Sequence, residues 1–204
     1  MNHKIGNNDS DQYLVEKVIG GDTSAFGIII RNTEGLVAQI VFKMINNAAD
    51  RKDIAQDIYL KAYHNLSGFK FHSRLSTWIG KIAYNTCLNY WEKKKPVLSG
   101  NLYEGTETDE ELMDRKVNNT IPGTENQTEK TLIRKELTRI LNAEIEQLPP
   151  VYKTLITLYH NEELSYGEIT QITSLPEGTV KNYLFRARKV IKESLLLKYK
   201  KEEL

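Results

Sequence analysis

The sequence predicts an all-α protein of two small helical domains joined by a flexible acidic linker, with a helix-turn-helix in the C-terminal domain. In both halves apolar residues recur every three or four positions, which is the period of an amphipathic helix. No stretch shows the strict alternation of a half-buried strand, and there is no internal repeat. The composition shifts between residues 96 and 130 toward Gly, Asn, Thr and Glu. We therefore expect a disordered start over 1–12, a domain over 13–95, a linker over 96–130 and a domain over 131–204.

Charge divides the chain in the same way. Residues 1–95 carry 13 Lys/Arg against 9 Asp/Glu, residues 96–130 carry 3 against 8, and residues 131–204 carry 12 against 10. Two mildly basic halves thus flank an acidic middle. As a flexible coil the linker would span about 30–35 Å, close to one turn of duplex DNA.

Several protein classes are disfavoured. Cys87 is the only cysteine, so there is no disulfide framework and the sequence is compatible with a reducing cytoplasm. No uninterrupted apolar run approaches the roughly 20 residues of a membrane helix, and the first residues lack the order of a secretory signal. We expect a cytoplasmic protein that does not insert into a membrane.

The first helices read as structural core. Leu14, Val15, Val18 and Ile19 form a stripe that stops at Gly20-Gly21, and two further apolar helices follow up to Ile45. The next helix, about 50–66, carries a buried side of Ile54, Ile58 and Ala62.

An acidic stripe accompanies this last helix. Asp50 is placed to cap it, and Asp50, Asp53 and Asp57 share a face at spacings of three and four. Neither metal ligation nor acid–base catalysis finds the further ligands that it would need. Solvation and protein docking remain equally good explanations of this stripe.

Residues 67–95 combine aromatic, amide and basic side chains. Residues 68–74 form a loop, and Ser76 or Thr77 can cap a helix that begins at Trp78. Aromatic faces stack on unpaired bases, amides bond base edges and cations hold phosphates, so this pattern suits single-stranded nucleic acid. The alternative is that Trp78 or Trp91 anchors the core.

Two supporting helices lead into the helix-turn-helix. The first covers about 132–148 and ends at Pro149-Pro150, and the second covers about 151–159. Ser165 and Glu168 form a capping-box pattern, and Thr173, Ser174 and Leu175 make a turn.

The second helix of this pair has one buried face, with the residues Val180, Leu184, Ala187 and Ile191. Its remaining residues are polar and basic, which is typical of a helix that enters the DNA major groove. A surface helix with an ordinary charged face is the alternative.

Nothing in the chain suggests an enzyme. His3, His64, His72 and His160 are scattered without ligand spacing, and no phosphate-binding glycine pattern occurs. We expect no metal, no cofactor and no catalytic residue.

Two separated segments resemble one family. DRKDIAQDIYLKAYHNL followed by FKFHSRLSTWIGKIAYNTCLNYW resembles the second domain of bacterial sigma factors. The segment from Glu146 to Leu195 resembles their fourth domain. With only a linker between them, the chain resembles a sigma factor of the extracytoplasmic-function (ECF) subfamily.

This resemblance implies partners and roles for particular residues. The partners would be core RNA polymerase, through its clamp helices and flap, promoter DNA, and an anti-sigma factor in members that have one. The polymerase-binding residues would be Asp50, Asp53, Gln56 and Asp57. Single-stranded −10 DNA would meet Lys70, Phe71, His72, Ser73, Arg74, Trp78, Lys81, Asn85 and Asn89. The −35 duplex would meet Thr179, Lys181, Asn182, Phe185, Arg186 and Lys189.

Two rival functions stay open at this point. A free-standing transcription regulator with an N-terminal sensing domain would bind DNA without polymerase. An enzyme acting on nucleic acid would need a metal cluster or a nucleophile–base pair, which the sequence does not supply.

Overall fold

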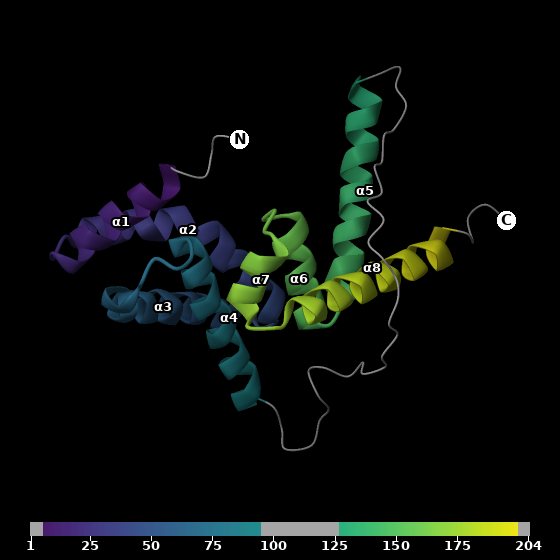
Figure 1. Ribbon diagram of the computed structural model, residues 1–204. Coiled ribbons are helices and arrows are strands. Elements are labelled where there is room, and N and C mark those ends of the chain that lie inside the picture. The colour runs from purple at the N-terminus through teal and green to yellow at the C-terminus, as the bar shows by residue number, and fades with distance from the viewer. Residues whose placement is uncertain (1–5, 95–126, 200–204) are drawn as a thin grey trace.

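The predicted all-α fold class is confirmed. A computed structural model describes residues 6–94 and 127–199, and the elements in these ranges are helices without a strand (Figure 1). They are α1 (Gly6–Ile19), α2 (Thr23–Met44), α3 (Ala48–Asn65), the 3₁₀ turn η1 (Leu66–Gly68), α4 (Leu75–Lys94), α5 (Gln127–Gln147), α6 (Pro150–His160), α7 (Tyr166–Thr173) and α8 (Glu177–Tyr199).

The ends of the first domain differ from the expectation. Helix α1 begins at Gly6, inside the segment 1–12 that the sequence predicts to be disordered. A tertiary contact accounts for part of this difference, because the Asp11 carboxylate accepts a hydrogen bond from the Leu75 N–H at 3.1 Å. Residues 96–126 of the predicted linker lie outside the described residues, as do 1–5, 95 and 200–204.

Helix α2 is the centre of the N-terminal half. The Asp22 side chain caps it by accepting from the backbone N–H groups of Ser24 and Ala25. Buried residues recur along its length, from Ala25 and Ile29 to Met44. By length and composition alone α2 could cross a membrane, with a mean hydropathy of 1.3 over the most apolar window. Its packing against α1, α3, α4 and α6 accounts for that apolar character within the described fold.

The four C-terminal helices follow the predicted signals closely. Helix α5 ends at Gln147, before the Pro149-Pro150 pair, and α6 begins at Pro150. Ser165 and Glu168 form the predicted capping box of α7. The face of α8 that carries Val180, Leu184, Ala187 and Ile191 is buried, as its spacing predicts.

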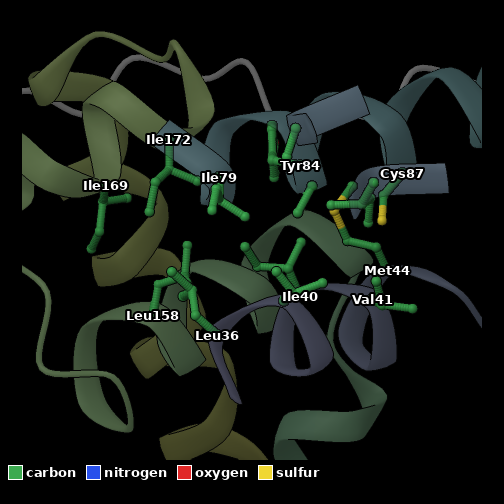
Figure 2. Close-up of a cluster of buried hydrophobic side chains, with 14 of the residues drawn as sticks. Leu36, Ile40, Val41, Met44, Ile79, Tyr84, Cys87, Leu158, Ile169 and Ile172 are labelled. Carbon is green, nitrogen blue, oxygen red and sulfur yellow. The ribbon is translucent and has the colours of Figure 1, made fainter. Parts of the chain in front are cut away.

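The two halves share one hydrophobic core. Helix α6 packs against α2 and helix α7 packs against α4, so the helix-turn-helix lies on the N-terminal half (Figure 1). Figure 2 shows Leu158, Ile169 and Ile172 of the C-terminal half beside Leu36 and Ile79 of the N-terminal half, in a single buried cluster. The sequence predicts two domains but contains no signal for this contact between them.

The turn between α7 and α8 contains a residue that glycine would suit better. Ser174 is in the left-handed region at φ 59° and ψ 15°, where a Cβ is unfavourable. We expect Ser174→Gly to raise the free energy of unfolding by about 1 kcal/mol, measured by urea denaturation. Ser174→Ala removes the same hydroxyl but keeps the Cβ, so it should give no gain, and an equal gain from both variants would contradict the explanation.

Candidate nucleic-acid interface

Backbone hydrogen bonds fix both ends of the loop 69–74. The Phe69 N–H donates to the Leu66 carbonyl of η1, and the Trp78 N–H donates to the Arg74 carbonyl. Helix α4 therefore begins at Leu75, three residues before the predicted start at Trp78. The predicted Ser76 or Thr77 cap is wrong, because Asp11 of α1 binds the first N–H of this helix instead.

The Asp11 carboxyl lies at the base of this loop and is half-buried. Burial raises its pKa above the ordinary value, and the Leu75 N–H and the nearby Arg74 charge oppose this shift. The backbone N–H of Leu75 thus holds the carboxylate under the loop, near the Arg74 charge. This contact orients the start of α4 relative to α1.

Aromatic rings brace the loop from within. The ring of Phe69, which is buried, lies 4.7 Å from Phe71 and 5.2 Å from Trp78, centroid to centroid. Phe71 has φ 57°, a backbone conformation that is unusual for a bulky residue. The rings therefore hold Phe71 in a strained conformation at the tip of a polar loop, while His72 stays exposed.

Helix α4 presents polar side chains along one exposed line. Lys81, Asn85 and Asn89 are exposed, and Trp78 is half-buried at the start of the same face. The opposite face, with Ile79, Ala83 and Cys87, is fully buried. The predicted strand-binding residues of α4 thus lie in one sector of the helix, and the loop directly precedes that helix. We call this predicted set the strand face: residues 70–74, Trp78, Lys81, Asn85 and Asn89.

Trp91 serves the core instead. Its indole N–H donates to the Met44 carbonyl at 2.8 Å, which ties the end of α4 to the end of α2. Of the two tryptophans, Trp91 is therefore an anchor and Trp78 borders the strand face.

The aspartates of the predicted acidic stripe on α3 differ in their contacts. Asp50 accepts hydrogen bonds from the Tyr90 hydroxyl and from Lys94 of α4, the latter at 2.7 Å. The bonds from Lys94 and Tyr90 hold the pKa of this carboxyl below its ordinary value. The predicted capping role is wrong, because Asn47 caps α3, and Asp50 joins α3 to α4.

The other predicted docking residues remain accessible. Asp53, Gln56 and Asp57 are exposed on α3. Asp57 pairs with Lys61 one turn on, at 2.6 Å, in an exposed contact that contributes little to stability. We call these three predicted docking residues the docking face: Asp53, Gln56 and Asp57.

The docking face and the strand face meet in a cleft. A cavity of about 470 Å³ between α3 and α4 is lined by Asp57 and Lys61 on one side and by Asn89 and Lys93 on the other. Lys61 also donates to the Thr86 hydroxyl at 3.3 Å, across the floor of this cleft. The two predicted surfaces are thus adjacent, a relation that helical spacing alone does not reveal.

Helix α8 exposes the residues predicted to read duplex DNA. Lys181, Asn182, Phe185 and Lys189 are exposed, whereas Thr179 and Arg186 are partly buried. Lys181 pairs with Glu177 at 2.8 Å, so part of its charge is offset at the start of the helix. The sequence analysis assigns no role to Arg188. Its guanidinium lies over the ring of Tyr159, so this contact joins α8 to α6.

Groups that could carry out catalysis are scarce in the described part of the chain. No cluster of three or more His, Cys, Asp or Glu side chains with metal-binding geometry is found among these residues. Burial raises the pKa of the Cys87 thiol to about 12, so this cysteine is protonated at neutral pH.

Three important contacts between distant residues were not predicted. Asp11 caps α4, Tyr90 binds Asp50, and Glu168 pairs with Arg74 at 3.3 Å across the contact between the halves. Each acts on a partner at least 40 positions away in the chain, so no local pattern could identify them.

Comparisons with known proteins place this arrangement in a family. The family pattern described as "Sigma-70 region 2" matches residues 29–97, and "Sigma-70, region 4" matches residues 138–191. The first range contains the strand face, and the second contains the part of α8 that carries the predicted duplex-reading residues 179–189. The two matched ranges are separate in the sequence, and helices from both ranges pack against each other in the structure.

Relatives and solved structures agree. The ECF RNA polymerase sigma-E factor of Haemophilus influenzae is 32% identical over 192 residues, covering 91% of this chain and 95% of that protein. The ECF RNA polymerase sigma factor SigW of Bacillus subtilis is 31% identical, covering 89% and 94%. The sigma factor RpoE of Bartonella quintana, solved with the anti-sigma factor NepR, has the same fold at a TM-score of 0.57 and 18% identity, covering 85% of this chain and 97% of that one. The chain belongs to the ECF subfamily of RNA polymerase sigma factors.

Proposed function

We propose that this chain binds core RNA polymerase and directs promoter-specific initiation, with its N-terminal domain capturing the melted −10 strand and its C-terminal domain reading the −35 duplex. The observation that carries the proposal is the occurrence, within the two matched sigma regions of one chain, of exposed amide and lysine side chains beside a half-buried Trp78 and of the basic helix α8. We assign residues 13–95 and 131–204 to these domains, with 96–130 as the linker. The protein acts in the cytoplasm as a specificity subunit and not as an enzyme.

The strand face supports base capture by its chemistry. Exposed Asn85 and Asn89 offer amides for base edges, and Lys70, Arg74 and Lys81 offer cations for phosphates. Base stacking is worth about 1–3 kcal/mol, against roughly 1.4 kcal/mol for opening a base step. A few captured bases therefore suffice to keep a short segment open.

The docking face supports attachment to the polymerase clamp helices. Asp53, Gln56 and Asp57 are exposed and polar, and Asp50 positions α3 against α4 behind them. We assign the polymerase flap to the C-terminal domain. A further partner is an anti-sigma factor, as in the solved complex of RpoE with NepR.

One experiment tests the proposal against both rivals. Core polymerase is incubated with and without this chain on a genomic promoter library, and run-off transcripts are sequenced. Transcripts with shared upstream elements that depend on the chain are expected. A folded chain that binds duplex DNA but initiates nowhere would favour the free-standing regulator, and altered or cleaved DNA would favour a nucleic-acid enzyme.

Removing the docking carboxylates should weaken polymerase binding. We expect Asp53→Ala with Asp57→Ala to reduce the affinity for core polymerase by at least about 1 kcal/mol, roughly five-fold, in a fluorescence titration. The melting temperature should hardly change, because both side chains are exposed. Glu136→Ala with Glu193→Ala removes two exposed carboxylates elsewhere, and equal affinities of the two double variants would refute the docking role.

Arg186 distinguishes base reading from phosphate binding. Arg186→Ala should lower affinity for promoter duplex by about 1–3 kcal/mol if the side chain reads a base, or lower the salt slope by about one if it contacts phosphate. Arg139→Ala on α5 is the control, since it removes an exposed guanidinium outside α8. An unchanged affinity and an unchanged slope would exclude Arg186 from the interface.

A further inference from the structure

Both ends of the loop 69–74 rest on helix α1. At the first end, α1 packs against η1, whose Leu66 is buried. At the second end, the Asp11 carboxylate of α1 accepts the hydrogen bond from the Leu75 N–H, where α4 begins. Helix α1 in turn packs along α2, the central helix of this half. One helix therefore joins the two ends of the loop to the core.

A chain of contacts links the first turn of α4 to the tip of the loop. Trp78 lies in this turn, and its ring packs on Phe69, which packs on Phe71. Phe71 has a positive φ, a conformation that persists only where the surrounding structure imposes it. The position of the first turn of α4 therefore determines where Phe71 and the polar residues after it lie.

The Asp11 carboxylate is suited to hold this turn. The first N–H groups of a helix have no partner within the helix, and its positive end attracts an anion. A hydrogen bond to a carboxylate is stronger than one to a neutral acceptor, and Asp11 is half-buried, so water competes less for it. The acceptor comes from 64 positions away in the chain, so it fixes α4 against α1 as well as capping it.

We propose that Asp11 is a positioning residue for strand capture: through the first turn of α4 it holds the loop 69–74 in the conformation that receives an unpaired base. Asp11 itself contacts no DNA. The inference rests on the proposed function, because that function assigns the loop to strand capture. A loop that is already in its binding conformation loses less freedom on binding, and a rigid site adapts less to a wrong base.

Base discrimination by the holoenzyme tests the inference. A promoter recovered from the run-off library is rebuilt with its −10 segment pre-melted, and each base of that segment is replaced in turn. Asp11→Ala removes the acceptor and should lower the preference for the native base at the captured position by about five-fold, the equivalent of one helix cap. Asp11→Asn keeps an oxygen that can accept from the Leu75 N–H, so its preference should stay within about two-fold of the wild type.

Asp22→Ala is the matched control. The Asp22 carboxylate also binds first-turn N–H groups, those of Ser24 and Ala25 on α2. This variant should lose a similar amount of thermal stability and keep the wild-type base preference. Equal losses of preference in Asp11→Ala and Asp22→Ala would assign the effect to general destabilisation and refute the inference. Wild-type preference in Asp11→Ala, or an Asn variant as impaired as the Ala variant, would refute it as well.

The fluorescence of Trp78 gives a second measurement without DNA or polymerase. In a Trp91→Phe background Trp78 is the only tryptophan, and its ring lies 5.2 Å from that of Phe69. Adding Asp11→Ala should release the first turn of α4 and increase acrylamide quenching of Trp78 by about two-fold, whereas Asp11→Asn and Asp22→Ala should leave it unchanged. Unchanged quenching in the Ala variant would show that Asp11 does not hold this turn.

The two proposals fail in different experiments. A wild-type holoenzyme that initiates nowhere refutes the proposed function, and with it the assignment of the loop to strand capture. A wild-type holoenzyme that initiates, together with an Asp11→Ala holoenzyme that discriminates bases equally well, refutes only the positioning role.

Discussion

The double variant Asn85→Ala with Asn89→Ala is expected to lose promoter opening while keeping its fold. Both amides are exposed on α4, next to the loop and facing away from the buried Ile79 side. A well-placed amide–base contact is worth about 1–3 kcal/mol, so two together predict a loss of roughly 30-fold or more in affinity for the melted strand. Core-polymerase affinity should stay within about two-fold, because the docking face is on α3.

Initiation on a linear promoter and on the same promoter with a pre-melted bubble separates the possible causes. Loss on both templates places the amides in strand binding, whereas loss on the linear template alone places them in the melting step. Asn142→Ala, an exposed amide on α5, is the matched control. Full activity of the double variant on both templates would remove Asn85 and Asn89 from the strand face.

The features that could be predicted from the sequence are those determined within a few residues. The Ser165–Glu168 capping box and the turn over residues 173–175 follow from residues that are at most three positions apart. The buried face of α8 follows from helical periodicity, as does the exposed line of Lys81, Asn85 and Asn89 on α4.

The features that the sequence could not reveal depend on contacts between distant segments. Asp50 fits a helix cap by its position, yet it binds Tyr90 and Lys94 about 40 residues away. Lys43 and Glu146 are 103 positions apart. Neither spacing nor charge indicates which of many exposed carboxylates meets which cation, since this depends on how the helices pack. The packing of α7 on α4 and of α6 on α2 belongs to this class.

Leu158→Ala is expected to destabilise the whole described fold and not only the C-terminal half. Leu158 is fully buried on α6, in the cluster that also contains Leu36 of α2. Removing three buried carbons at such a site costs about 2–5 kcal/mol. Leu60→Ala, at a side chain 50% exposed on α3, removes the same atoms and should change stability by at most about 0.5 kcal/mol.

The positions of the two tryptophans allow the coupling to be measured. Trp78 and Trp91, the only tryptophans of the chain, both lie on α4, so their fluorescence reports unfolding of the N-terminal half. Far-UV circular dichroism reports all helices. If one core holds both halves, Leu158→Ala should move the two urea midpoints downward together, although the substitution is in the other half.

Independent halves predict a different result. The dichroism transition would then split or shift while the fluorescence midpoint stays at the wild-type value, because a cavity in α6 would leave α2 and α4 undisturbed. Equal downward shifts of the two midpoints would show that α6 belongs to the same cooperative unit as α2 and α4. An unchanged fluorescence midpoint would show that the shared cluster does not couple the two halves, although Leu158 and Leu36 lie in it together.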